Sequence, residues 1–228
     1  MKKLTILLLL LILLSKPLFV FAGEIIVETI CDSYGIPLAY IYYSEGKEIV
    51  RQKVNTLGEF SLGQIPKDIP DGVIKYYYSE GGGWVEAPRK DGKTNGLVRG
   101  YYPGGQLSFE ENYSNGKTNG VSKNYYEDGH LSEEEFRRDG RLHGTRKVYY
   151  RNGQLKAEEN YVDGKRERGR SYTKDGKLSM DQIWKDGRFV MRYYKNGKIE
   201  TEKTQKDQKI INVKEYDKNG NLISEINY

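Results

Sequence analysis

The chain has 228 residues, of which 37% are hydrophobic, 12% aromatic and 30% charged, and its formal net charge is +5. It contains one cysteine, Cys31, which excludes the intramolecular disulfides that hold many small secreted domains together. Charges of both signs are interspersed along the chain rather than gathered in basic stretches, and this arrangement argues against a nucleic-acid partner.

Residues 1–22 have the form of a secretory signal peptide. Two lysines precede an almost unbroken apolar run from Leu4 to Leu14, and Ala22 is a small residue at the expected cleavage site. Pro17 and its neighbours interrupt the run before it reaches the ~20 apolar residues that a membrane anchor needs. We therefore expect cleavage and export to the periplasm, the cell envelope or the extracellular space. Cleavage leaves 34 basic and 32 acidic residues, so the basic character belongs largely to the signal.

Residues 23–82 are predicted to form a small β domain. Residues 32–39 contain a Gly-x-Pro-Leu step, and residues 56–62 contain a Thr-x-Gly-x-Phe-x-Leu step. Both steps resemble the carboxypeptidase regulatory-like (transthyretin-like) domain, and this resemblance implies a β-sandwich. The alternative is a divergent outer repeat, because Tyr42 precedes Gly46 as tyrosines precede glycines in the region that follows.

From residue 83 the chain repeats itself. Glycines that follow Asp, Asn or Gly form two series, and each series advances in steps of 24 or 23 residues that shorten near the C-terminus. The first series is Gly92, Gly116, Gly140, Gly164 and Gly187, and the second is Gly105, Gly129, Gly153, Gly176, Gly197 and Gly220. Asp-Gly and Asn-Gly pairs supply the positive φ angles of tight hairpin turns. Residues 83–228 therefore predict an all-β fold, an elongated meander of about six stacked antiparallel β-hairpin repeats.

Each repeat places a tyrosine four residues before its second-series glycine and Leu or Ile two residues after it. Successive side chains of a strand point to opposite faces, so Leu107, Phe109 and Tyr113 share one face. We expect an aromatic and aliphatic ladder on that face and Lys, Arg, Glu and Ser on the other. Phe136 follows Leu131 by five residues, which indicates either a β-bulge or an exposed phenylalanine.

Residues 113–120 and 161–165 contain the string Tyr-x-x-Gly-Lys, and residues 138–144 contain the related Arg-Asp-Gly-Arg-Leu-His-Gly. Residues 149–155 are an example of the Tyr-Tyr-x-x-Gly-x-Leu string. These strings resemble the bacterial MORN-repeat variant family over residues 83–228. The resemblance implies a sheet of stacked hairpins and supplies no catalytic residue. Many chains of this kind are labelled antitoxins, and MORN repeats are linked to protein association and sometimes to membrane lipids. An export signal does not suit the neutralisation of a cytoplasmic toxin.

No catalytic, cofactor or metal site is predicted, and the protein is not expected to be an enzyme. The two histidines, His130 and His143, both lie beside turns and cannot form a multi-histidine metal site. The acidic run at residues 133–135 recurs at 110–111 and 158–159, which is typical of repeat surface rather than of a catalytic carboxylate pair.

A binding role remains, and a protein partner is the main hypothesis. The partner would dock on the sheet or add a strand to its edge. The alternative is an envelope lipid or glycan that meets the tyrosine-rich strands, and self-association is a further outcome. We expect the regular central units, residues 92–187, to bind through solvent-side positions, and the candidate residues are Lys123, Arg146 and Lys147. The segment 210–228 is expected to be an apolar closing hairpin that shields the end of the sheet.

Overall fold

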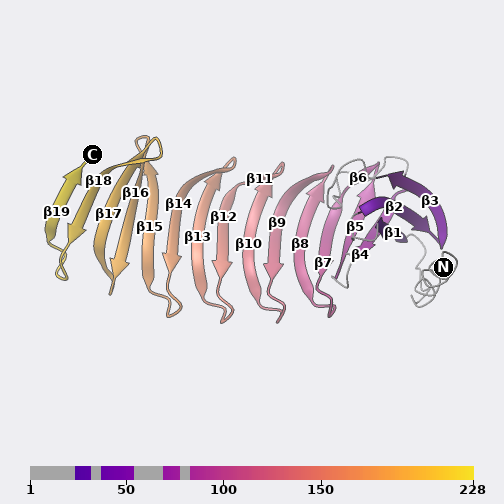
Figure 1. Ribbon diagram of the computed structural model, residues 1–228, viewed down its shortest axis with the longest axis horizontal. Coiled ribbons are helices and arrows are strands. Elements are labelled where there is room, and N and C mark those ends of the chain that lie inside the picture. Colours follow the sequence, from indigo (N-terminus) through magenta and orange to yellow (C-terminus); the bar gives the residue numbers. More distant parts are fainter. Residues whose placement is uncertain (1–23, 32–36, 54–68, 78–82) are drawn as a thin grey trace, which may run out of the picture.

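The computed structural model describes residues 24–31, 37–53, 69–77 and 83–228, and in these ranges the chain forms one sheet of 19 strands without a helix (Figure 1). The predicted signal peptide and most of both carboxypeptidase-like strings lie outside the described residues. Within the described ranges no helix is long and apolar enough to cross a membrane. The strands are β1 (Glu24–Cys31), β2 (Pro37–Ser44), β3 (Lys47–Lys53), β4 (Gly72–Tyr77), β5 (Trp84–Lys90), β6 (Lys93–Thr94), β7 (Gly96–Tyr101), β8 (Leu107–Ser114), β9 (Lys117–Tyr125), β10 (Leu131–Arg138), β11 (Arg141–Leu142), β12 (Gly144–Tyr149), β13 (Leu155–Val162), β14 (Lys165–Tyr172), β15 (Leu178–Lys185), β16 (Arg188–Lys195), β17 (Lys198–Lys206), β18 (Lys209–Tyr216) and β19 (Leu222–Asn227).

From β4 to β19 the long strands pair antiparallel in sequence order. Each two-residue strand, β6 or β11, pairs with the strand before it, as does the strand after it. The exception lies at the N-terminal end, where β1 pairs antiparallel with β2 and parallel with β4. Among the described strands, the edges of the sheet are therefore β3 and β19. The chain forms a long curved ribbon with strands across its long axis (Figure 1). This architecture confirms the predicted elongated meander of stacked hairpins.

Strands β1–β4 belong to the same sheet as the repeats, because β4 pairs with β5 along its whole length. The boundary at residue 82 and the choice between a separate domain and a divergent repeat stay predictions.

The turn glycines occupy two kinds of turn. Asn115 and Gly116 have φ angles of 52° and 81°, and the other Asp-Gly and Asn-Gly pairs of the first series repeat this combination, which is that of a type I′ hairpin. Turns of the second kind are longer, and in them only the glycine has a positive φ. Gly197 is the exception, because it forms a two-residue turn of the first kind with Asn196.

Hydrogen bonds between neighbouring units clamp both long margins of the sheet. On one margin, the N–H of Gly140 donates to the carbonyl oxygen of Thr118 at 2.8 Å, and Gly116 and Gly164 make the equivalent bond. On the other, the Tyr126 hydroxyl donates to the carbonyl oxygen of Tyr149 at 2.7 Å. Tyr102 and Tyr150 repeat that contact. In the next unit Thr173 replaces the tyrosine, so the clamp ends there.

The hydrophobic core gathers at the N-terminal end of the sheet. Ile25, Val27, Tyr42 and Ile74 pack in one buried cluster, and a second cluster of Val85, Ala87 and Val98 contacts Phe109 and Tyr113. Among the described residues, Val98 is the last hydrophobic residue that is fully buried. The core therefore stops at the first regular repeats.

Beyond β9, the expected ladder of aromatic and aliphatic side chains continues only in part. Tyr–Leu pairs recur across strands on that face, as Tyr125–Leu131, Tyr149–Leu155 and Tyr172–Leu178. Between these pairs, the positions that follow Phe109 hold Asn124 and Glu133, and Arg146 contacts Glu133. The register pairs Phe136 with Val121, with no bulge between Glu133 and Arg137, and Phe136 is 37% exposed. It is therefore an exposed phenylalanine on the other face.

The C-terminal hairpin does not close the sheet as expected. Ile223 and Tyr228 are 66% and 76% exposed, and β19 pairs only with β18 among the described residues.

Candidate interaction surface

One face of the sheet carries a row of charges whose sign alternates from strand to strand. Each strand from β4 to β19, apart from the two-residue strands β6 and β11, contributes one charged residue that lies directly opposite the charged residues of its neighbours. We call this row the charge ladder and the face that bears it the ladder face. In order its residues are Lys75, Glu86, Arg99, Glu110, Lys123, Glu134, Lys147, Glu158, Arg170, Asp181, Arg192, Glu202, Lys214 and Glu225.

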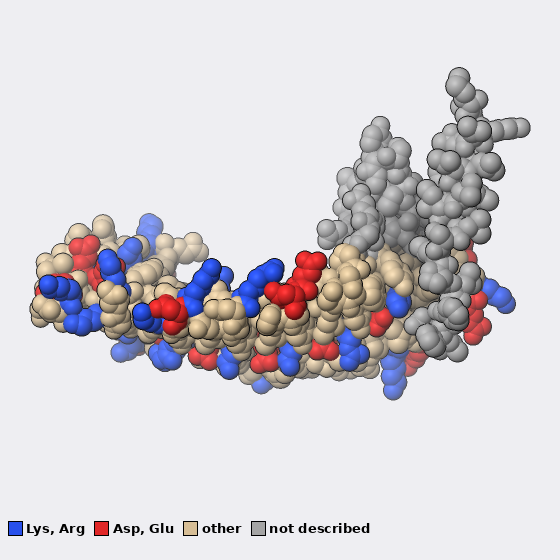
Figure 2. Space-filling view, turned by 90° about the horizontal axis from the view of Figure 1, so that it is seen from below, with Lys and Arg blue, Asp and Glu red and all other residues tan. Residues whose placement is uncertain are grey.

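Many neighbours in the charge ladder form ion pairs. Arg99 Nε lies 3.1 Å from Glu110, and Lys123 Nζ lies 3.7 Å from Glu134. Arg192 Nε lies 2.7 Å from Glu202. Seen along the sheet, blue and red side chains alternate (Figure 2). At ~4.8 Å between strands, the row is about 60 Å long. Opposite charges in direct cross-strand positions stabilise the sheet by roughly 0.2–1 kcal/mol a pair, whereas like charges there destabilise it.

The reverse face carries a compact ion-pair network centred on Arg146. Its guanidinium lies 2.6 Å from Glu133 on β10 and 2.6 Å from Glu159 on β13. Glu159 also lies 2.7 Å from Arg166 and accepts a hydrogen bond from the Tyr161 hydroxyl. Arg146 is thus satisfied by carboxylates of both flanking strands.

The surroundings of these carboxylates move their pKa values in opposite directions. Burial opposes ionisation of Glu159, but hydrogen bonds from Arg166, Arg146 and Tyr161 outweigh it and lower the pKa of Glu159. Burial raises the pKa of Glu135, and the adjacent Arg137 only partly offsets this effect. Tightly bound carboxylates of this kind stabilise a fold and are poorly available to a partner.

An aromatic cluster lies beside the start of the charge ladder. The rings of Trp84 and Tyr101 stack with centroids 4.7 Å apart, and Tyr77 lies 6.3 Å from Trp84 at a tilt. Lys75 lies over the rings of Tyr77 and Trp84, and Glu86 accepts hydrogen bonds from the Trp84 indole and the Tyr101 hydroxyl. Because Tyr101 covers one face of Trp84, the cluster packs on itself.

The structure divides the three predicted binding residues between the two faces. Lys123 and Lys147 both lie on the ladder face, directly opposite Glu134 from its two sides. Arg146 precedes Lys147 and therefore points to the reverse face, into the ion-pair network. The sequence placed all three together on one solvent side, and only the two lysines share a surface.

The histidines and adjacent glutamates do not combine into a reactive site. His130 lies 3.2 Å from Asp128, and His143 contacts Arg138 and Asp163. Paired glutamates such as residues 110–111 and 158–159 point to opposite faces, because neighbouring residues of a strand alternate. In the described ranges, no three His, Cys, Asp or Glu side chains are grouped so that they could hold a metal ion.

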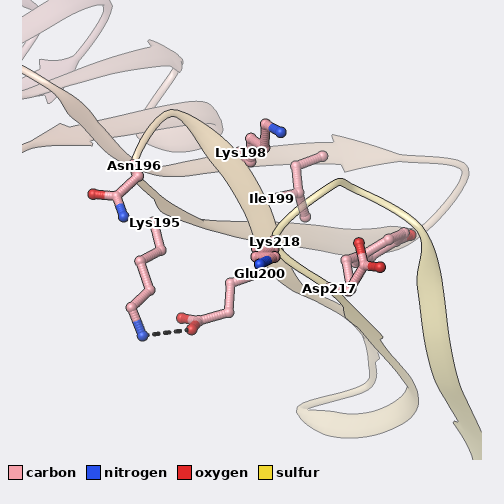
Figure 3. Close-up of a pocket in the computed structure, with 8 residues that line it drawn as sticks. Lys195, Asn196, Lys198, Ile199, Glu200, Asp217 and Lys218 are labelled. Carbon is pink, nitrogen blue, oxygen red and sulfur yellow. Dashed lines mark hydrogen bonds and ion pairs between the residues drawn. The ribbon is translucent and has the colours of Figure 1, made fainter.

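A shallow hollow of about 290 Å³ lies near the C-terminal end, between the β16–β17 turn and the segment that leads to β19 (Figure 3). Lys195 and Glu200 form an ion pair at 3.0 Å on its rim, and Ile199, Asp217 and Lys218 also line it. Because the hollow is open and Lys195 and Glu200 on its rim bind each other, it is a poor candidate for a ligand site.

Sequence reasoning missed the charge ladder and the tyrosine clamps. The ladder residues recur at alternating steps of 11 and 13 residues through the regular units, and this signal is visible in the sequence. The clamps use the second tyrosine of each Tyr-Tyr pair, at positions 102, 126 and 150, whereas the tyrosine of the sequence pattern is the first of each pair.

Comparison with protein families agrees with this geometry. The profile described as MORN repeat variant matches residues 94–115, 118–139, 142–163 and 211–228. The first three matches cover the units with clamps on both margins, and residues 164–210, where the clamps end, lie between the third match and the fourth. No curated protein matches the chain.

Proposed function

From the four segments within residues 94–228 that match MORN repeat variants, which are commonly protein-binding or membrane-binding modules, we propose that the chain is an exported scaffold whose ladder face binds a protein partner. The observation that supports this function is the charge ladder. It presents charges of both signs in fixed register along about 60 Å of uninterrupted sheet.

The alternation of charge favours a protein over a membrane. Anionic membranes attract clusters of Lys and Arg, whereas each basic residue of the ladder after Lys75 lies between two acidic ones. Protein surfaces, in contrast, are recognised by complementary patterns of both signs. The Trp84 cluster supports the same choice, since a sugar ring stacks on an open aromatic face and Tyr101 covers one face of Trp84.

The clamps on both margins of the central units favour a binding surface in the middle of the sheet. Units clamped on both margins hold their strands in fixed positions, and a rigid surface loses less conformational entropy on binding. Lys123 and Lys147 lie in these units, so we assign them to the partner surface. Arg146 instead holds β10, β12 and β13 together.

Export of the scaffold is part of the proposal and rests on residues 1–22. The mature protein begins at Gly23 and acts in the periplasm, the cell envelope or outside the cell. An antitoxin-like role would then be neutralisation of a partner in that compartment. Intact-mass measurement of protein from the envelope fraction should give a chain that starts at Gly23, and cytoplasmic protein that retains Met1 would contradict export.

Site-specific crosslinking tests the partner surface. A photoreactive amino acid at Val121, which lies exposed on the ladder face, should capture a partner in intact cells, and mass spectrometry should identify it. The double variant K123E/K147E should abolish capture. The double variant K174E/K218E changes two exposed turn lysines by the same charge and should retain it. Equal capture by both variants would overturn the assignment.

A further inference from the structure

We propose that the outer edge of β19 is a strand-docking site for an extended segment of a partner protein, with Lys or Arg opposite Glu225. The site lies at the end of the sheet rather than on the central ladder face, so it goes beyond the scaffold function proposed above.

The charge ladder indicates which charge a strand docked on the outer edge of β19 should carry. All acidic residues of the ladder except Glu225 lie between two basic ones. Asp181, for example, lies 3.4 Å from Arg170 on one side and 3.9 Å from Arg192 on the other. Glu225 has Lys214 at 3.7 Å on one side, and on its other side the described residues place no strand. A further strand in the same register therefore requires a cation at this position.

The side chains of β19 suit an incoming strand. Leu222, Ile223 and Ile226 are 51%, 66% and 49% exposed, although they belong to a regular strand. Backbone groups of an edge strand that point away from the sheet are ready to pair with another chain. Natural edges are usually defended by Lys or Pro, and β19 contains neither, whereas β3 at the opposite edge contains three basic residues.

A second copy of β19 does not meet the requirement. The residues of β19 that point to the ladder face are Ile223, Glu225 and Asn227, since they alternate along the strand. Antiparallel pairing of two β19 strands would thus bring no cation to Glu225, and one register would place two Glu225 carboxylates opposite each other. The chemistry of the edge indicates a different, basic strand.

The chain itself supplies a probe of the required kind. Strand β18 carries Asn212 and Lys214 on the ladder face and already pairs with β19 from the inner side. A fluorescein-labelled peptide with the β18 sequence, residues 209–216, should bind the mature chain saturably, as measured by fluorescence anisotropy. Binding should weaken at high salt, because the contact between the lysine and Glu225 is electrostatic.

A charge exchange gives the decisive comparison. The variant E225K should bind the β18 peptide at least tenfold more weakly, and a peptide with Lys214→Glu should recover the affinity for E225K. The control E127K makes the same change at an exposed turn and should bind like the original chain. Melting curves confirm that both variants are folded.

Three results would overturn the proposal: no saturable peptide binding, equal peptide binding by E225K and the original chain, or concentration-dependent association of the chain in sedimentation that E225K abolishes. The last result would show that a second copy of this chain occupies the β19 edge. The variant K123E/K147E should bind the peptide normally, so failure of the central partner surface and failure of the β19 site are separable.

Discussion

The hydroxyl of Tyr126 donates a 2.7 Å hydrogen bond to the carbonyl oxygen of Tyr149, and so joins two consecutive repeats across their shared margin. The change Y126F removes only this bond, because phenylalanine keeps a ring beneath Arg151. We expect a loss of about 1 kcal/mol in the free energy of unfolding, measured by chemical denaturation. Tyr228 is 76% exposed, and Y228F should leave stability unchanged. Equal effects of both changes would show that the bond contributes nothing.

The β17–β18 turn lacks the glycine that the other two-residue turns contain. Asp207 and Gln208 have φ angles of 49° and 64°, and a side chain in this left-handed region is strained. The variant Q208G should therefore raise the free energy of unfolding by about 1 kcal/mol. The reverse change at the equivalent position, G197Q, should lower it by a similar amount. A destabilising Q208G would contradict the strain argument.

Exchange of one ion pair should distinguish a ladder from a set of isolated pairs. In the double variant K123E/E134K the exchanged residues still attract each other, but residue 123 then faces Glu110 and residue 134 faces Lys147 with like charge. Stability should fall by roughly 0.5–1 kcal/mol at low salt and recover at high salt. An isolated pair would tolerate the exchange, so full stability at low salt would exclude coupling along the row.

The pH dependence of stability should reveal the bonds to Glu159. Its pKa is lower in the folded protein than in the unfolded chain, so its ionised form stabilises the fold at pH values above the unfolded pKa of about 4.3. This contribution is lost as the pH falls through the lowered folded pKa. The melting temperature of E159Q should lie below that of the original chain at pH 7, and the gap should narrow below about pH 4. A constant gap from pH 7 to pH 3 would contradict this assignment.

The sequence was sufficient to predict the meander of strands, but not to predict which residues share a face of the sheet. The positive φ angles that Asn115-Gly116 and the other turn pairs require determine where strands begin and end. Which residues face each other depends on register shifts such as those at Gly100/Tyr101 and Val148/Tyr149, and each shift changes the face on which later residues lie.

The division of the predicted binding residues has the same origin. A basic residue in a strand looks alike in sequence on either face, and Arg146 differs from Lys147 only by one position. Its role became visible once pairing brought Glu133 and Glu159 to its two sides. The exposed Phe136 is a further case, because the sequence allowed a bulge beside it and the structure places the bulge at Leu131/Glu133 instead.

Because the core is confined to the N-terminal end, the stability of the hairpins should decrease toward the C-terminal end of the sheet. Strands beyond β9 depend on nearest neighbours, ion pairs and clamps, while strands between β1 and β8 also share buried hydrophobic clusters. Opening should therefore start at β19 and travel toward β5, one hairpin after another, as in a linear array of coupled units. Backbone amides would then exchange with deuterated solvent in a gradient, fastest at the C-terminal end and slowest around Val85 and Val98.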